Sequence, residues 1–130
     1  MKQELVDILE QLCERDTRYR PEAYTFVLQA LSYTQKKFKK CKHVTGKELL
    51  EGVKILLMEK FGPMTMTVLR HWGVDSTEDI GNIVFNLVTN RVLSKTEDDD
   101  IESFKNVYDF ETVFNQGYRK SLHKKISRLR

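Results

Sequence analysis

Apolar side chains recur every three or four positions in successive segments of this chain, which is the spacing of a buried α-helical face. The spacing predicts helices over about residues 2–14, 21–35, 46–61, 63–72 and 76–90. The chain should therefore be mainly α-helical. The apolar positions that define these faces are Leu5, Ile8, Leu9, Leu12, Tyr24, Val27, Leu28, Leu31, Leu49, Leu50, Val53, Leu56, Leu57, Met64, Val68, Leu69, Trp72, Ile80, Ile83, Val84, Leu87 and Val88.

Residues with special capping or backbone properties mark the helix ends. Thr45 and Glu48 have capping-box spacing, in which each side chain accepts a hydrogen bond from the backbone of the other. Gly62 followed by Pro63 predicts a stop, because glycine tolerates the left-handed conformation and proline cannot continue a helix. The remaining signals are Pro21 as a first helical residue, Gly73 as a helix end, and Ser76 or Thr77 as an N-cap.

The segment after the fifth predicted helix has a different pattern. Val92 and Leu93 precede an acidic run at 97–100, and aromatic residues within 104–110 follow it. Two short apolar segments around a polar turn are typical of a β-hairpin. Helices followed by a hairpin have the element order of a winged helix. We therefore predict a mainly α fold, with an N-terminal helical pair packed on a winged-helix-like three-helix unit that has a C-terminal β-hairpin.

The length of 130 residues favours one folded domain. We expect a single globular domain over 1–117, with the N-terminal helices in 1–44 and the winged-helix-like part in 45–117, followed by a basic C-terminal helix or tail over 118–130. Gly81 inside a predicted helix costs about 1 kcal/mol relative to alanine, which indicates close packing there, within the protein or by a ligand or partner. The residues expected in or beside the core are Leu57, Phe61, Trp72, Ile83, Leu87, Phe104, Tyr108 and Phe110.

Charge is unevenly distributed although the net charge is only +3. Segregated charge creates local fields that the net value hides. Solvated faces and tails are the simplest interpretation; the alternatives are an acidic partner or nucleic acid on the basic runs and a basic partner on the acidic one. The basic runs are Lys36, Lys37, Lys39, Lys40 and Lys42, and Arg119, Lys120, Lys124, Lys125, Arg128 and Arg130; the acidic run is Glu97, Asp98, Asp99 and Asp100.

No motif in the sequence specifies a reaction. Cys13 and Cys41 form no CxxC pair, although Cys41 lies among lysines that lower a thiol pKa, and His43 is two residues away. The acids at 98–100 and Glu102 offer oxygen ligands for Ca²⁺ or Mg²⁺ but lack the order of an EF-hand loop. No glycine-rich phosphate loop is present. We predict a protein that is not an enzyme and that uses no cofactor or metal.

The chain opens with an amphipathic segment rather than an apolar leader, and its cysteine usage suits a reducing compartment. No apolar run approaches the roughly 18 residues that a membrane-spanning helix needs. We expect a cytoplasmic protein without a membrane span.

Short motifs between Tyr19 and Phe114 form a fairly specific combination. They are Arg20–Tyr24, His43–Leu50, Phe61–Met64, Thr77–Gly81, Val84–Val88, Leu93–Thr96 and Val107–Phe110. In these motifs the chain resembles a small bacterial family of unassigned function found chiefly in planctomycete and verrucomicrobial genomes. The basic stretch after Asn115 lies outside the resemblance, which implies no activity.

These observations favour a protein-interaction or adaptor module that binds an unknown protein partner or self-associates. The alternative is a winged-helix-like nucleic-acid-binding regulator that uses the two basic runs. In that alternative the helix over 77–90 would be the reading helix, but it has no Lys or Arg, and acids lie in the predicted wing. Phosphate contacts supply much of DNA affinity, so this surface disfavours DNA. The positions of the helix expected to face outward include Glu78, Asp79, Asn82, Asn86 and Asn90.

Overall fold

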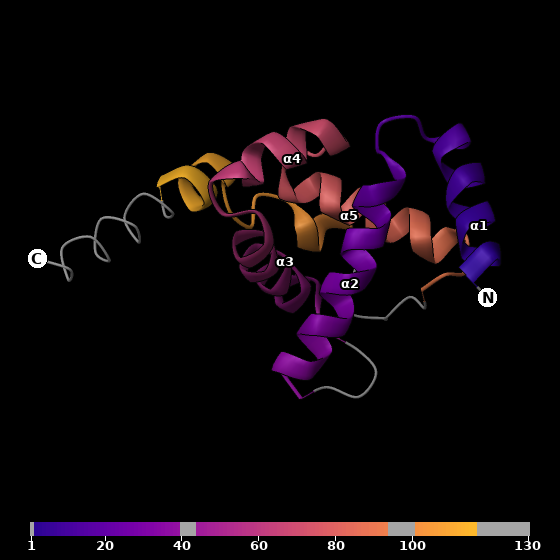
Figure 1. The fold of residues 1–130 in the computed structure, drawn as a ribbon. Coiled ribbons are helices and arrows are strands. Elements are labelled where there is room, and N and C mark those ends of the chain that lie inside the picture. The colour runs from indigo at the N-terminus through magenta and orange to yellow at the C-terminus, as the bar shows by residue number, and fades with distance from the viewer. Residues whose placement is uncertain (1, 40–43, 94–100, 117–130) are drawn as a thin grey trace, which may run out of the picture.

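The computed structural model describes residues 2–39, 44–93 and 101–116 (Figure 1). The described residues form helices and no strand, which confirms that the fold is mainly α. None of these helices is long and apolar enough to cross a membrane. In chain order the elements are α1 (Lys2–Arg15), α2 (Pro21–Lys37), α3 (Gly46–Phe61), the 3₁₀ turn η1 (Gly62–Met64), α4 (Thr65–Trp72), α5 (Thr77–Thr89), the 3₁₀ turn η2 (Ile101–Phe104) and the π-helical turn η3 (Glu111–Gln116).

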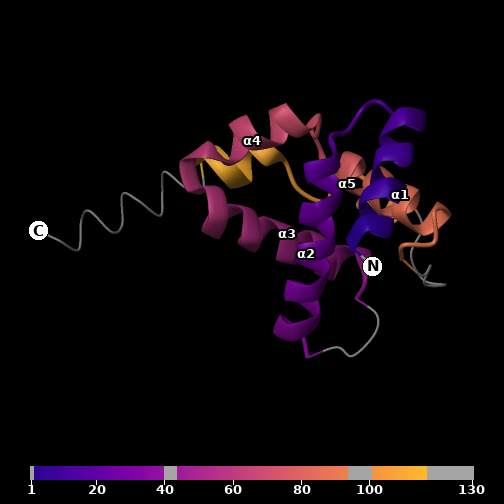
Figure 2. The ribbon, with the colours of Figure 1, turned by 45° about the vertical axis from the view of Figure 1, so that its right-hand side comes forward.

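Helix α2 is the central element of the fold. It contacts α1, α3, α4 and α5, and Figures 1 and 2 show α1 and α3 on opposite sides of it. Its buried residues are spread around much of the helix, as expected for an element that is packed on several sides. They are Ala23, Tyr24, Phe26, Val27, Ala30 and Thr34.

Helices α2 and α3 approach each other very closely at Thr34 and Gly52. Thr34 is fully buried, and its Oγ1 donates a 2.6 Å hydrogen bond to the carbonyl of Ala30 one turn earlier. A Cβ placed on Gly52 would lie only 1.8 Å from Thr34 Oγ1. Glycine at position 52 is therefore required by the closeness of the neighbouring helix and not by its own backbone conformation.

The predicted helix ends are confirmed at several positions. Thr45 Oγ1 accepts from Glu48 N at 3.1 Å, and Glu48 Oε1 accepts from Thr45 N at 2.9 Å, which completes the capping box. Gly73 ends α4 in the left-handed region, at a φ of 84°. The carboxylate of Asp79 caps α5 by accepting a 3.2 Å hydrogen bond from Ser76 N. The local chemistry of these residues is sufficient to place the boundaries.

The predicted β-hairpin, and with it the wing of a winged helix, is wrong. Val92 and Leu93 stay at the end of α5, where both backbone N–H groups donate to the carbonyl of Leu87, at 2.9 and 3.3 Å. Phe104 lies in the η2 turn, and Phe110 immediately precedes η3. Phe104 and Tyr108 are four positions apart, and this spacing fits one face of a helical turn as well as one face of a strand, so a short apolar run does not distinguish the two. The acidic run expected at the hairpin tip lies outside the described residues.

The aromatic segment around η2 packs on α5 through a hydroxyl and a glycine. Thr77 is buried; its Oγ1 donates to the carbonyl of Phe104 at 2.6 Å and accepts from Val107 N at 3.3 Å. A Cβ on Gly81 would lie 2.7 Å from the Cβ of Phe104. Close packing at Gly81 is therefore internal, by the Phe104 side chain.

The predicted core is confirmed. Its members are all either buried or packed against the buried cluster. Leu57, Trp72, Ile83, Leu87, Phe104 and Phe110 belong to the buried set, and Phe61 and Tyr108 are the partly buried members beside it.

We expect Gly52→Ala to lower the free energy of unfolding by about 1–3 kcal/mol, because the new methyl group overlaps Thr34. The sign of this change identifies the overlap as its cause, because Gly→Ala in an exposed helix interior raises the free energy of unfolding by about 1 kcal/mol. Urea unfolding followed by circular dichroism measures the effect. In a Thr34→Ala background the cost of Gly52→Ala should shrink, and an equal cost in both backgrounds would contradict this explanation of the helix packing.

Candidate functional site

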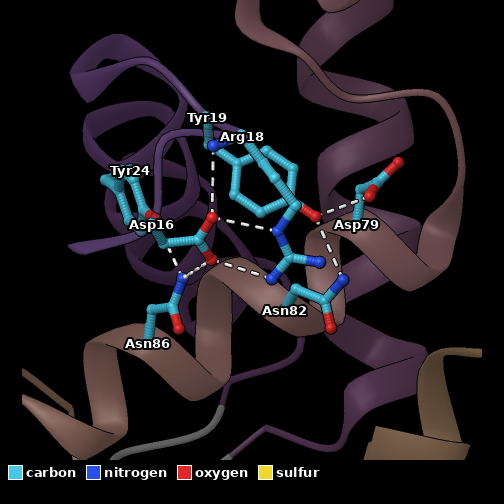
Figure 3. Close-up of polar contacts among 7 residues, drawn as sticks. All are labelled: Asp16, Arg18, Tyr19, Tyr24, Asp79, Asn82 and Asn86. Carbon is cyan, nitrogen blue, oxygen red and sulfur yellow. Dashed lines mark hydrogen bonds and ion pairs between the residues drawn. The ribbon is translucent and has the colours of Figure 1, made fainter. Parts of the chain in front are cut away.

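A cluster of polar side chains joins the loop between α1 and α2 to one face of α5 (Figure 3). The carboxylate of Asp16 lies at one end of it. Asp16 Oδ1 and Oδ2 accept from Arg18 Nε and Nη2 at 2.9 and 2.8 Å, and Asp16 Oδ2 also accepts from Asn86 Nδ2 at 3.0 Å. The hydrogen bonds from the Arg18 guanidinium hold the pKa of Asp16 well below its usual range, with a further contribution from Asn86.

Tyr19, which is buried, lies at the other end of the cluster. Its hydroxyl donates a 2.5 Å hydrogen bond to Asp79 Oδ1 and accepts one of 3.0 Å from Asn82 Nδ2. Burial, together with the hydrogen bond to Asp79, raises the pKa of Tyr19 above its usual range. The phenol is therefore held as a neutral donor.

Asn86 connects the cluster to the core. Its Nδ2 donates to Asp16 and also to the hydroxyl of Tyr24, at 3.0 Å, and Tyr24 is fully buried on α2. Burial raises the pKa of the Tyr24 hydroxyl to about 12. The cluster thus attaches both the preceding loop and α2 itself to α5.

This geometry corrects the expected surface of α5. The five side chains expected to face outward are all only partly exposed: Glu78, Asp79, Asn82, Asn86 and Asn90. Asn82 and Asn86 have their amide groups bound to the phenol oxygens of Tyr19 and Tyr24. Asparagine reads adenine with that same amide. Helix α5 is a packed structural helix, and its asparagines are not presented for base contacts.

A separate surface pocket lies between α2, the end of α3 and the end of α4. It is open to solvent and has a volume of about 370 Å³. Its apolar part is made by Phe26, Phe61 and Trp72, and polar side chains stand at its edge. The lining residues are Pro21, Glu22, Thr25, Phe26, Gln29, Lys60, Phe61 and Trp72.

The three aromatic rings of this pocket pack against one another. The ring centroids of Phe26 and Trp72 are 5.3 Å apart, those of Phe61 and Trp72 5.7 Å, and those of Phe26 and Phe61 6.1 Å. Rings at such separations are in contact, so they leave no space among themselves for a cation. The three rings form an apolar floor. We call this floor, together with the polar residues at its edge, the aromatic pocket.

The sequence predicted no site here, although a weak signal was present. Phe26 lies off the apolar face that Tyr24, Val27 and Leu28 define, and Phe61 and Trp72 are the last residues of their helices. Large aromatic residues off the main stripe or at helix ends are candidates for a surface pocket. Only the packing of α2, α3 and α4 brings these three together.

Few of the predicted contact residues lie in the described part of the chain. Lys36, Lys37 and Lys39 are exposed at the end of α2. Outside the described residues lie Lys40, Lys42, Arg119, Lys120, Lys124, Lys125, Arg128, Arg130, Asp98, Asp99 and Asp100, together with Cys41 and His43.

Two further residues with candidate chemistry, Cys13 and Glu102, lie in the described part of the chain. Burial raises the pKa of the Cys13 thiol, and the carboxylates of Glu22 and Asp16 raise it further, which is the opposite of an activated cysteine. Glu102 is exposed and forms an ion pair with Lys105 at 2.8 Å. Within 2–39, 44–93 and 101–116, no group of three or more His, Cys, Asp or Glu residues is placed to hold a metal ion.

Comparison with known proteins gave no match to a protein-family model, to a curated protein or to a solved structure. The resemblance to the small bacterial family therefore stays a prediction from the sequence.

We expect Asp16→Asn to lower the free energy of unfolding at neutral pH by about 1–3 kcal/mol, because the charged hydrogen bonds to Arg18 are removed. The pKa of Asp16 is depressed in the folded state, so the stabilisation is complete above the unfolded pKa of about 3.9 and is lost as the pH falls below it. Urea unfolding should therefore show a smaller difference in the free energy of unfolding between variant and wild type near pH 3 than at neutral pH.

Asp75→Asn is the matched control, since the Asp75 side chain is exposed and Asp75 contacts the cluster through its backbone N–H, which donates to Asp79 Oδ2. If the difference in the free energy of unfolding between Asp16→Asn and wild type stays constant with pH, the charge of Asp16 does not contribute to stability.

Proposed function

We propose that this protein is a non-enzymatic interaction module of the cytoplasm, which binds a protein partner through the aromatic pocket. The observation that supports the proposal is the pocket itself, an aromatic floor with polar side chains at its edge, open to solvent. Aromatic anchors surrounded by a polar rim are the arrangement of the energetically dominant part of protein interfaces. The free thiol of Cys13 suits a reducing compartment.

The openness of the pocket favours a side chain of a partner over a small molecule. Sites for small molecules usually bury most of the ligand surface within a cleft. This pocket is bounded by one face of α2 and the last residues of α3 and α4, and it stays open on the solvent side. An apolar side chain projecting from a partner surface fits that shape, because the partner itself closes the open side.

The polar cluster on α5 supports the proposal in a different way. It joins seven polar side chains across three parts of the described chain, yet its donors and acceptors bind one another. Its function is to hold the loop after α1, helix α2 and helix α5 together. The aromatic pocket is therefore the better candidate for contact with another molecule.

The second candidate function is nucleic-acid binding. The observation that favours it is the exposure of Lys36, Lys37 and Lys39 together at the end of α2. Such a cluster binds phosphates without reading bases, because ammonium groups contribute mainly as point charges. The amide groups of Asn82 and Asn86 are hydrogen-bonded within the protein, which disfavours sequence-specific binding through α5.

We expect Thr25→Arg to weaken partner binding roughly tenfold. Thr25 is an exposed lining residue on α2, so the longer side chain fills the pocket without disturbing the core. Affinity purification with the tagged full-length chain, quantified by mass spectrometry, should recover a partner with wild type and roughly tenfold less of it with the variant. Circular dichroism should show equal stability.

The matched control is Thr67→Arg, the same substitution at an exposed position of α4 outside the pocket. Equal recovery with both variants would exclude the pocket as the binding surface. Absence of any partner specific to the wild-type chain would contradict the interaction module itself.

The nucleic-acid alternative has its own signature. If it holds, the chain binds random duplex DNA at low salt and the affinity falls steeply as salt rises. Replacing Lys36, Lys37 and Lys39 by Gln should then weaken binding and reduce the salt slope by about one unit for each phosphate that is no longer neutralised. Fluorescence anisotropy with labelled DNA measures both. We expect no such lysine-dependent binding, and its appearance would favour the alternative.

A further inference from the structure

We infer that the partner segment held by the aromatic pocket is dipolar, with an apolar side chain between a basic residue that faces Glu22 and an acidic residue that faces Lys60. This inference rests on the proposed function and names the class of its partner. It follows from the order of the lining residues and from the hydrogen bonds at the two ends of the pocket.

The pocket has two distinct ends because its lining residues follow α2. Glu22 lies in the first turn of α2 and Gln29 two turns later, a separation of about 10 Å along a helix. Lys60 belongs to the Gln29 end, since its Nζ lies 3.0 Å from Gln29 Oε1. Trp72 belongs to the Glu22 end, since its carbonyl accepts a 3.2 Å hydrogen bond from the N–H of Arg20.

The aromatic floor lies between these ends. Phe26 is four residues after Glu22 and three before Gln29, and its ring contacts both Phe61 and Trp72. Because Glu22 and Lys60 both line the pocket, an apolar group bound on this floor lies between an acidic and a basic residue.

Both charged groups retain capacity for a partner. An ammonium group has three N–H donors, and Lys60 uses one of them on Gln29. The Glu22 side chain is exposed; its carboxylate acts electrostatically on the Cys13 thiol, and among the described residues it accepts no hydrogen bond. Arg20, the neighbouring cation, is not a lining residue, and its Nε donates to the carbonyl of His71 at 3.0 Å.

Opposite charges at the two ends discriminate among partners. A segment with two basic residues meets like charge at Lys60, and one with two acidic residues meets like charge at Glu22; either costs affinity and suppresses the wrong partner. A separation of about 10 Å corresponds to three residues of an extended strand or seven of a helix. The spacing in the partner therefore depends on its conformation, while the pairing of charges does not.

The test is a selection of displayed random peptides, about a dozen residues long, on the immobilised full-length chain and on two charge variants. Wild type should enrich peptides with one basic and one acidic residue around an apolar one. Glu22→Lys makes both ends basic and should enrich two acids, and Lys60→Glu makes both ends acidic and should enrich two bases. The direction of the peptide does not matter, because the readout is the combination of charges.

The affinity of each peptide can be measured at the pocket itself. Trp72 is the only tryptophan of the chain and lines the pocket, so its fluorescence reports occupancy. A wild-type-selected peptide should bind each single variant roughly tenfold more weakly, because an exposed ion pair is replaced by a like-charge contact. Glu22 and Lys60 are both exposed, and a cooperative melting transition, lowered by a few degrees because each reversal opposes a helix dipole, would verify that the variants fold.

The outcomes separate the inference from the function on which it rests. One outcome would refute the dipolar partner and leave the interaction module intact. In it, the selected peptides bind wild type and Thr67→Arg but not Thr25→Arg, while wild type, Glu22→Lys and Lys60→Glu all select the same charge pattern. Purely apolar peptides would refute it in the same way. No enrichment over Thr25→Arg would refute both, and a selected charge pattern that changes with the variant would support both.

Discussion

The close packing of α2 against α3 determines the shape of the surface that we propose as functional. Gly52 has no side chain, so Thr34 can lie against the backbone of α3 while its hydroxyl stays bonded within its own helix. Farther along the same two helices lie Gln29 and Lys60, whose side chains meet at 3.0 Å. The distance between the two walls of the aromatic pocket is thus set in the core, by residues that do not line the pocket.

The other end of the pocket is fixed by a different set of contacts. The loop that leads into α2 is bound to α5 through hydrogen bonds of Asp16 and Tyr19. The same loop approaches the end of α4 closely: a Cβ on Gly73 would lie 2.1 Å from the carbonyl oxygen of Arg18. This loop ends at Arg20, whose N–H binds the carbonyl of Trp72. The polar cluster therefore contributes to the pocket without lining it, by holding the first turn of α2 beside the last turn of α4.

The sequence was informative where local chemistry decides the structure and misleading where packing does. The capping box at Thr45 and the stop at Gly73 depend on neighbouring residues alone, so they were predictable. The residues Phe104 to Phe110 fit a strand or a helical turn, and Thr77 and Gly81 on α5 favoured the turn by binding and accommodating Phe104. Nothing in the local sequence encodes that choice. The aromatic pocket likewise needs three helices to meet, which no single periodicity reveals.

The structure also changes the electrostatic argument about nucleic acids. From the sequence, the acids of the fifth helix made it a poor surface for DNA. In the structure the stronger reason is that Asn82 and Asn86 use their amide groups inside the protein, so the helix has little left with which to read a base, whatever its charge. Phosphate contacts from Lys36, Lys37 and Lys39 would add affinity without sequence specificity. The aromatic pocket combines an apolar floor with an acidic and a basic lining residue, which is why we propose this pocket, and not α5, as the surface that contacts a protein partner.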